Sequence, residues 1–440
     1  MKKLLIFISL LFVSSTAYAE MNKTSYTLSD AIEFAVKNNP RIIQSSKDVE
    51  IGTYGISEAK ANKMPRLDFN SGATRYRYAS PITPISGSPL KGSGFPEFDS
   101  NIYDFGVSFI LPLYRGGRLD AGVTIAEIKK SIAEDMFRMS KQDLIYNLTN
   151  VYYKIYQLEK LLDANEASVK QLEAHKKNVE LFLKAGTVPK VELLKTEVEL
   201  AHAKQNAIVV RNSIESSYEL LKTLMGIEDI NRKISLVHEN SPADKYPALE
   251  EATNRAFSLR PDYNAVSKKK KVVEEKVNFA QGKRLPIVYL SSEYSERSGD
   301  SFEFKENWNL ALRLSVPIFD GGLIRSEISK EKKEMEKVRE EERSLRLDII
   351  REIKDSYLNI ENAGERIGVL QKAVETAKEN LRIEVLRYET GSGTSTDVID
   401  SQTMLLRAET DYLQAIYDKN IAIASLRRAI GEDIYEEASK

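Results

Sequence analysis

The sequence predicts a mainly α-helical protein that also carries membrane β-strands and is built from two structural repeats. Three observations predict this class. The order of motifs in the first half of the chain returns in the second half, which indicates a duplicated unit. Two stretches of about 67 residues keep an apolar heptad pattern with no interrupting proline. Each half also contains segments of about ten residues in which apolar and polar residues alternate.

The two halves align with a single change of offset. Pro65 corresponds to Pro286, 221 residues later, and Pro112 corresponds to Pro317, 205 residues later. The difference of 16 residues is therefore lost between Pro65 and Pro112. The other paired motifs are Leu28-Ser-Asp-Ala31 with Leu249-Glu-Glu-Ala252, Leu111-Pro-Leu-Tyr-Arg-Gly-Gly117 with Val316-Pro-Ile-Phe-Asp-Gly-Gly322, and Met225-Gly226 with Ile430-Gly431.

The first residues have the pattern of a secretory signal. Lys2 and Lys3 precede an apolar run from Leu4 to Val13, and Ala17-Tyr18-Ala19 supplies the small residues of a cleavage site. We therefore expect a signal peptide over residues 1–19, cleaved after Ala19. The alternative, an N-terminal membrane anchor, would need about 20 apolar residues, and this run is too short.

The composition excludes several classes of function. Lys and Arg number 64 and Asp and Glu 65, so the net charge of −1 gives no reason to expect nucleic acid as a partner. The chain has no Cys, which excludes disulfides, thiolate chemistry and a lipid-attachment cysteine. After the signal there is no run of 18 apolar residues, so we expect the chain to enter a membrane only as strands.

Each repeat is expected to contain a helix, two strands, a very long helix, a short tip and a second long helix. An equatorial linker is expected at 226–248 and a C-terminal tail at 432–440. In repeat 1, residues 20–225, the elements are strands at about 66–78 and 102–112 and long helices at 118–184 and 190–225. In repeat 2, residues 249–431, they are strands at about 286–296 and 307–317 and long helices at 322–389 and 395–430.

The long helices are predicted from their heptads. A helix of 67 residues is roughly 100 Å long, too long for one globular core, so it must project as a stalk or pack beside copies of itself. Glycine at the tips, Gly186 and Gly391, is usual where a helix ends. The apolar heptad positions include Leu144, Leu148, Val151, Ile155, Leu158 and Leu162 in the first half and Ile349, Ile353, Ile360, Ile367, Leu370 and Val374 in the second.

The second strand of each repeat alternates most clearly. The apolar positions are Tyr103, Phe105, Val107, Phe109 and Leu111, which map at offset 205 onto Trp308, Leu310, Leu312, Leu314 and Val316. A half-buried sheet of a soluble domain has the same alternation, but the signal peptide and the aromatic strand starts favour a membrane barrel. The segment Ser80–Ser100, with four prolines, is expected to be a long irregular loop that points out of the cell.

Four strands cannot close a barrel, because an open edge in lipid leaves backbone groups unpaired. The chain is therefore expected to oligomerise. Two copies would give eight strands, with an interior filled by side chains, and three copies would give twelve, with room for water. The long helices would then stand side by side and form a helical tube continuous with the barrel.

This combination of features resembles the TolC family of outer-membrane efflux proteins. The resemblance rests on the signal peptide, the duplicated unit, the strand exits at Leu111 to Gly117 and Val316 to Gly322, and the tip Tyr388-x-x-Gly391-x₅-Asp397-Val-Ile-Asp400. It implies a homotrimer in outer-membrane lipid, with a 12-stranded β-barrel continuous with a long periplasmic α-helical barrel. An inner-membrane transporter would supply the energy, and a periplasmic adaptor (membrane fusion) protein would dock on the helical tips.

Asp397 and Asp400 are candidates for a channel gate. They lie three residues apart at the start of a helix and so share one face. One interpretation is helix capping, with Ser395, Thr396 and Asp397 as suitable N-cap residues. The other is a ring, in which three copies place six carboxylates around the tunnel mouth and favour cations. Both interpretations can hold together.

The resemblance adds further tip residues. It implies that Glu192 and Tyr388 help to hold the tunnel closed, and that the dipeptides Gly186-Thr187 and Gly391-Ser392 face the adaptor, although turn chemistry alone also explains them. Some members carry a basic residue two positions after the second-half glycine as a lock. Here that position is Gly393, and Lys190 is a candidate replacement.

The sequence offers no residues for catalysis, a cofactor or a metal. His175, His202 and His238 are isolated, without a second His at ligand spacing or a paired base. No glycine-rich phosphate loop follows a strand. The expected function is a passive exit duct for efflux or secretion, gated at the tips. The alternative is a periplasmic coiled-coil protein that bridges envelope layers without conducting.

Overall fold

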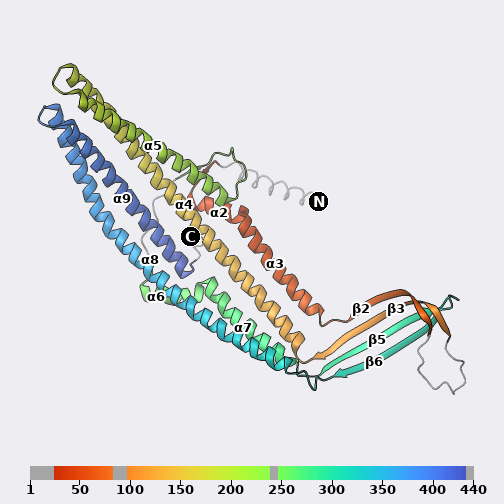
Figure 1. Ribbon diagram of the computed structural model, residues 1–440. Coiled ribbons are helices and arrows are strands. Elements are labelled where there is room, and N and C mark those ends of the chain that lie inside the picture. Colours follow the sequence, from red (N-terminus) through yellow and green to blue (C-terminus); the bar gives the residue numbers. More distant parts are fainter. Residues whose placement is uncertain (1–23, 83–96, 238–245, 433–440) are drawn as a thin grey trace, which may run out of the picture. The chain divides into compact units, whose positions relative to one another are not determined.

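The computed structural model describes residues 24–82, 97–237 and 246–432, and its chain divides into two compact units (Figure 1). The expected signal peptide and most of the expected loop at Ser80–Ser100 lie outside the described residues, as do parts of the linker and tail. Unit 1 comprises the described parts of Met1–Ser46, Asp135–Asn264 and Ser344–Lys440. Unit 2 comprises those of Lys47–Glu134 and Ala265–Arg343.

The helices follow the duplicated order along the chain. The four long ones are α4 (Arg118–Lys184), α5 (Lys190–Met225), α8 (Leu323–Glu389) and α9 (Ser395–Ile430). The shorter ones are α2 (Leu28–Asn38), α3 (Pro40–Ala61), α6 (Leu249–Leu259) and α7 (Pro261–Gly282). Helices α4 and α8 contribute residues to both units, so the compact units do not coincide with the repeats.

The helix expected before the strands of each repeat is in fact two helices, which corrects the sequence interpretation. The break falls at Asn39 and Arg260, whose backbones are extended, and the next helix begins at Pro40 or Pro261. Proline lacks an N–H group and keeps the residue before it out of the helical region, while its own backbone suits the first turn of a helix. One proline therefore ends the first helix and begins the second.

Unit 1 has two equivalent apolar cores, one for each repeat. In the first, α2 packs with the neighbouring parts of α4 and α5, and in the second α6 packs with those of α8 and α9. The buried residues that correspond at the repeat offsets are Ala31 and Ala252, Ala35 and Ala256, Leu144 and Ile349, Leu148 and Ile353, Ile155 and Ile360, Leu221 and Leu426, and Met225 and Ile430. The heptad positions next to these cores are thus buried, whereas those further along the helices, such as Leu162 and Ile367, are half-buried.

The linker between the repeats contributes an element that the sequence did not indicate. Strand β1 (Ser25–Tyr26) pairs in parallel with β4 (Ser235–Leu236), next to the first core. The ring of Tyr26 is 2% exposed and meets Phe34 edge to face at 5.9 Å, and its hydroxyl accepts a hydrogen bond from Arg232 at 2.6 Å. A pair of two-residue strands is too short to leave a periodic signal.

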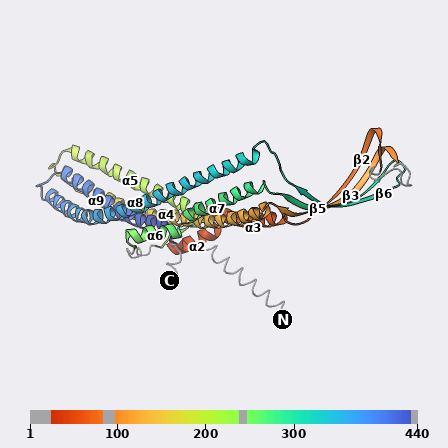
Figure 2. The same ribbon diagram turned by 90° about the horizontal axis from the view of Figure 1, so that it is seen from below.

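Unit 2 contains an antiparallel sheet with the order β2-β3-β5-β6 (Figures 1 and 2). Its strands are β2 (Arg66–Pro81), β3 (Phe98–Arg115), β5 (Ile287–Ser298) and β6 (Lys305–Ser315). The central pair, β3 and β5, joins the two repeats, and β2 and β6 lie at the edges.

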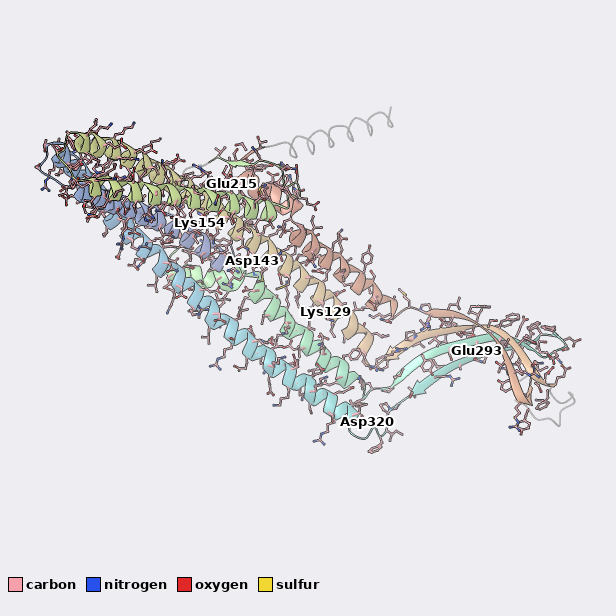
Figure 3. The ribbon with its side chains drawn as sticks, turned by 45° about the horizontal axis from the view of Figure 1, so that its top comes forward. Lys129, Asp143, Lys154, Glu215, Glu293 and Asp320 are labelled. Atoms are coloured by element: carbon pink, nitrogen blue, oxygen red, sulfur yellow. The ribbon has the colours of Figure 1, made fainter. Side chains whose placement is uncertain are left out.

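The register of this sheet separates an apolar face from a polar face. One row across the four strands consists of Phe69, Val107, Tyr294 and Trp308, and the adjacent row consists of Asp68, Ser108, Glu293 and Asn309. Residues directly opposite one another share a face, and consecutive residues of a strand lie on opposite faces. Figure 3 labels Glu293 on β5. Phe69 is 70% exposed and Trp308 69%, so the apolar face is uncovered within the chain.

No helix among the described residues combines the length and apolar character needed to cross a membrane.

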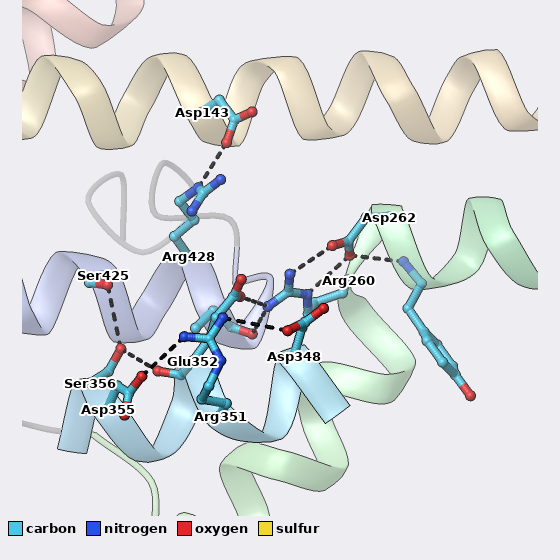
Figure 4. A network of polar contacts seen from close by, with 12 residues as sticks. Asp143, Arg260, Asp262, Asp348, Arg351, Glu352, Asp355, Ser356, Ser425 and Arg428 are labelled. Atoms are coloured by element: carbon cyan, nitrogen blue, oxygen red, sulfur yellow. Dashed lines mark hydrogen bonds and ion pairs between the residues drawn. The ribbon is translucent and has the colours of Figure 1, made fainter. Parts of the chain in front are cut away.

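Polar contacts join the interior of α4, in the first repeat, to the C-terminal end of α9, in the second (Figure 4). Asp143 on α4 accepts a hydrogen bond from Arg428 on α9 at 2.8 Å, and Gln142 donates to the carbonyl of Gly431 at 2.9 Å. Arg260, at the α6–α7 break, donates to Asp262 and Glu352, each at 2.7 Å. Burial alone would lower the pKa of the Arg260 guanidinium, but its hydrogen bonds to the two carboxylates raise it, so it stays charged.

Candidate functional site

The two helix hairpins of unit 1, α4–α5 and α8–α9, have tips at the same end of that unit (Figures 1 and 2). Gly186 follows α4 with φ +76°, and Gly391 follows α8 with φ +77°. The next residues close the turns: the Thr187 amide donates to Phe182 O at 3.0 Å, and the Ser392 amide donates to Arg387 O at 2.8 Å. All four tip residues named in the sequence are exposed.

The tip glycines are required by the backbone and not by crowding. A Cβ atom placed on Gly186 or Gly391 would meet nothing within 4 Å, but an L side chain rarely adopts this left-handed conformation. The two tips therefore present the same backbone turn on an open surface.

Asp397 caps α9, as one of the two interpretations predicted, but the N-cap itself is Thr394 and not one of Ser395 to Asp397. The Thr394 hydroxyl donates to Asp397 Oδ2 at 2.7 Å, and the Asp397 amide donates to Thr394 Oγ1 at 3.2 Å. The backbone of Thr394 is extended, so the helix begins one residue later, at Ser395. The hydrogen bonds from Thr394, with a smaller effect from Arg387, lower the pKa of Asp397.

Asp400, three residues further along α9, has different surroundings. It is exposed and makes no hydrogen bond or ion pair with any described residue. Asp397 thus has a structural task within the chain, while Asp400 has none. Neither aspartate contacts Glu192 or Tyr388 through a hydrogen bond or ion pair among the described residues.

Glu192 and Tyr388, which come from different repeats, do lie together. Tyr388 on α8 is 3% exposed, and burial followed by the charge of Glu192 on α5 raises the pKa of its hydroxyl to about 12. The two groups are close, but they do not reach hydrogen-bond geometry: within the described part of the chain, the Tyr388 hydroxyl and Glu192 Oε2 are buried without a partner. The structure therefore places two polar atoms at this point that a small rearrangement could pair.

Around Tyr388 the two hairpins share an apolar core. Its ring meets Phe182 with 5.5 Å between centroids and meets His175 edge to face at 4.8 Å. The buried members of this cluster are Val179, Leu381, Tyr388, Val398 and Leu405, which come from α4, α8 and α9. A groove of about 840 Å³ between these helices has His175, Tyr388 and Gln402 in its lining.

His175 is the functional candidate that sequence reasoning missed, because it was treated as an isolated histidine on a helix face. It is 5% exposed, and its Nε2 lies 2.7 Å from Ser395 Oγ, 220 residues away. Burial lowers the pKa of its imidazole to about 4. A signal was present: His175 lies three residues after Leu172 and four before Val179, both buried, a spacing that puts the three on one face.

The remaining candidates stay apart. Lys190, the possible replacement for a basic residue at position 393, is exposed and forms no ion pair with a described residue. A Cβ atom on Gly393 would come within 3.0 Å of Arg387 Cβ, so this position is tightly packed. Within the described residues, no group of three or more His, Asp or Glu side chains is arranged to hold a metal ion.

Comparisons with known proteins agree with this architecture. The family model described as outer membrane efflux protein matches residues 31–227 and 252–432. The chain is 22% identical to the outer membrane protein TolC of Salmonella enteritidis, over 98% of this chain and 86% of that protein. It is also 22% identical to the solvent efflux pump outer membrane protein SrpC of Pseudomonas putida, over 91% of this chain and 84% of that protein.

A solved structure has the same fold. The outer membrane channel CmeC of Campylobacter jejuni superposes on this chain with a TM-score of 0.79, covering 94% of this chain and 88% of that one. The two sequences are 17% identical, so the similarity is one of fold: long helices with a four-stranded antiparallel sheet, in two repeats.

Proposed function

Because this chain belongs to the outer membrane efflux protein family and is an outer-membrane efflux channel with a periplasmic helical portion, we propose that it works as a passive exit duct. It is a channel component and not an enzyme. Its energy would come from an inner-membrane transporter, coupled through a periplasmic adaptor protein. A relative such as SrpC is by its name the outer membrane protein of a solvent efflux pump, which supports a role within a pump assembly.

The observation that carries the proposal is the uncovered apolar face of the sheet together with its two free edges. On β6, Leu310 is 65% exposed, Leu312 69% and Leu314 67%, and β2 and β6 have no strand beyond them among the described residues. Lipid would cover the apolar face, but lipid cannot pair a free edge, where each unpaired group costs several kcal/mol. A second and a third copy would pair the edges.

We propose a homotrimer. Three copies supply twelve strands, whose barrel leaves room for water, whereas two copies supply eight and a filled interior. The polar row with Asp68, Ser108, Glu293 and Asn309 would then line the lumen. The long helices of the three copies would form the periplasmic tunnel, and the signal peptide would be cleaved after Ala19.

The tips are the proposed gate and docking site. In a trimer Asp397 and Asp400 would supply a ring of six carboxylates at the tunnel mouth, with Glu192 and Tyr388 holding the two hairpins together. Lys190, which forms no ion pair with a described residue of its own chain, is available to a neighbouring copy as a lock. Gly186, Thr187, Gly391 and Ser392, all exposed, form the two similar turns on which an adaptor would dock.

A matched pair of variants tests the barrel. Leu312→Arg places a charge on the apolar face of β6, and Asn309→Arg places it on the polar face of the same strand. A charge facing lipid at mid-depth costs about 2–4 kcal/mol per strand, and a charge facing the lumen costs little. We expect heat-resistant trimers in outer-membrane extracts, and conductance in planar bilayers, for the native chain and Asn309→Arg but not for Leu312→Arg.

The same experiment separates the duct from the bridging alternative. A coiled-coil bridge would be recovered as a soluble periplasmic protein without conductance, and it would tolerate the two substitutions equally. That result would refute the proposed barrel, the proposed trimer and the proposed gate together.

A further inference from the structure

We propose that His175 is a gating residue: its buried hydrogen-bond chain ties the two hairpins of a protomer, and protonation of His175 favours the open tunnel. The inference rests on the proposed function, since it assigns a regulator to the proposed tip gate.

The tie runs through three helices. His175 Nε2 on α4 lies 2.7 Å from Ser395 Oγ on α9, and Ser395 Oγ lies 3.2 Å from Thr196 Oγ1 on α5. Thr196 donates its own proton to the carbonyl of Glu192 at 2.8 Å. Ser395 is 1% exposed and Thr196 0%, so water does not compete for these bonds.

Counting protons fixes the direction of each bond. A hydroxyl has one proton, and that of Thr196 is already donated to Glu192 O. Thr196 Oγ1 must therefore accept from Ser395, and Ser395 Oγ must accept from His175. The imidazole is thus assigned its proton on Nε2, and a second proton would go to Nδ1. The imidazolium would then be a buried cation, and burying a charge without a partner is costly.

No charged side chain among the described residues is hydrogen-bonded or ion-paired to the His175 imidazole, whose ring nitrogen has the neutral hydroxyl of Ser395 as its partner. The groove that His175 lines also carries ionisable groups of α8 (Glu375, Lys378, Glu379, Arg382, Tyr388 and Glu389) and Glu409 of α9. Glu192 on α5 acts on Tyr388, and Lys176 follows His175 on its own helix. Glu379 is paired with Arg382, Lys176 with Glu197, and Glu389 accepts from Asn178. Accordingly, burial is the cause that lowers the pKa of His175 to about 4.

The sign of the pH effect follows by linkage. When α4 separates from α9, the imidazole meets water and its pKa returns to an ordinary value of about 6.5. The preference for the closed state that comes from His175 is therefore complete above that value. It decreases as the pH falls from about 6.5 to 4. Between pH 7.5 and 5, the ratio of open to closed protomers rises about 30-fold.

The first test needs no conductance. Exchange of the imidazole C2 hydrogen with deuterium, followed by mass spectrometry of the full-length protein from pH 3 to 9, reports on the chain's three histidines separately. We expect slow exchange and a midpoint near pH 4 for His175, with His202, which is exposed, as the internal reference. A His175 midpoint near 6.5, or exchange as fast as that of His202, would overturn the inference.

The second test measures open probability in planar bilayers at pH 7.5 and 5. The native channel, closed for most of the time at pH 7.5, should open at least about 30-fold more at pH 5, because each protomer of the proposed trimer contributes its own His175. His175→Gln, whose amide can still donate to Ser395 but takes no proton, should respond several-fold less. Glu409→Gln is the matched control, because burial raises the pKa of Glu409 in the same groove. It should keep the native response.

Each outcome decides a different point. An equal pH response of the native channel and His175→Gln, or loss of the response in Glu409→Gln alone, would refute the role of His175. Ser395→Ala removes only the hydroxyl through which the tie runs, so it should raise the open probability at pH 7.5. No change there would also count against the tie. Absence of conductance at any pH would instead refute the proposed duct, while hydrogen exchange would still decide whether His175 is tied.

Discussion

Asn39 and Arg260 occupy equivalent positions in the two repeats and make equivalent hydrogen bonds with different chemistry. Asn39 Nδ2 donates to the carbonyl of Leu224 at 2.7 Å, and Arg260 Nη1 donates to that of Ala429 at 3.1 Å. In both repeats the residue lies in the break before a proline and holds the end of the last long helix. The neutral amide of Asn39 needs no counterion, whereas the guanidinium of Arg260 forms ion pairs with Asp262 and Glu352.

The first prediction follows from that difference. Arg260→Met should lower the free energy of unfolding by about 3 kcal/mol, because it leaves the two carboxylates without their cation in a partly buried site. Asn39→Ala should cost less, about 1–2 kcal/mol, since it removes neutral hydrogen bonds only. Urea titration of the purified protein measures both.

A surface ion pair serves as the control. Arg351 pairs with Asp348 and Asp355 at 3.5 and 3.4 Å on an exposed face of α8, and its side chain is 65% exposed. Arg351→Ala should change the unfolding free energy by less than about 1 kcal/mol. If it cost as much as Arg260→Met, the distinction between buried and exposed networks would be wrong.

The second prediction concerns the tips. Gly391→Ala should destabilise the tip by about 1–2 kcal/mol, because it forces an L side chain into the left-handed region. Gly122→Ala, within helix α4 where an added Cβ meets nothing within 4 Å, should instead stabilise by about 0.5–1 kcal/mol. Thermal unfolding midpoints should move in opposite directions, and a common direction would show that backbone conformation does not explain the tip glycines.

The third prediction separates the ring of Tyr388 from its hydroxyl. Tyr388→Phe removes a buried hydroxyl that has no partner among the described residues, so it should be neutral or slightly stabilising. Tyr388→Ala removes the packing against His175 and Phe182 and should cost about 3–5 kcal/mol. In bilayers Tyr388→Ala should open the channel and Tyr388→Phe should not. Opening by both would mean that the hydroxyl holds the gate.

The raised pKa of Tyr388 makes the stability of the native protein depend on pH in the alkaline range, and Tyr388→Phe removes that dependence. The folded protein keeps the phenol protonated to about pH 12, so the stability linked to Tyr388 is complete below pH 10 and is lost between pH 10 and 12. Tyr388→Phe should therefore resist alkaline unfolding better than the native chain. Identical alkaline midpoints would contradict the burial of the Tyr388 hydroxyl beside the charge of Glu192.

The fourth prediction distinguishes the two aspartates. Asp400→Asn should weaken block by divalent cations in planar bilayers without changing stability, because Asp400 has no partner within the described chain. Asp397→Asn should weaken block and also lower the melting temperature, since it disturbs the cap with Thr394. If the variant that combines Asp397→Asn with Asp400→Asn were blocked by divalent cations as strongly as the native channel, the proposed carboxylate ring would be wrong.

Local patterns were sufficient for the long helices and for the four strands of the sheet. The heptads predicted long helices because a helix buries one face at a fixed period, and Leu148 and Ile353 are indeed fully buried. The alternation in β3 and β6 predicted strands with one apolar face, and Trp308 lies on such a face. The proline that divides each first helix was visible at Pro40 and Pro261, but its consequence was overlooked.

The pairing of distant segments was decided only by the tertiary structure. His175 and Ser395 are 220 residues apart, and Glu192 and Tyr388 belong to different repeats, so no period along the chain relates them. Which helix faces meet depends on how two hairpins pack side by side, a relationship that sequence spacing does not record. The sequence therefore determined the long helices, the strands of the sheet and their duplication, and the packing of one repeat on the other decided which side chains share the site.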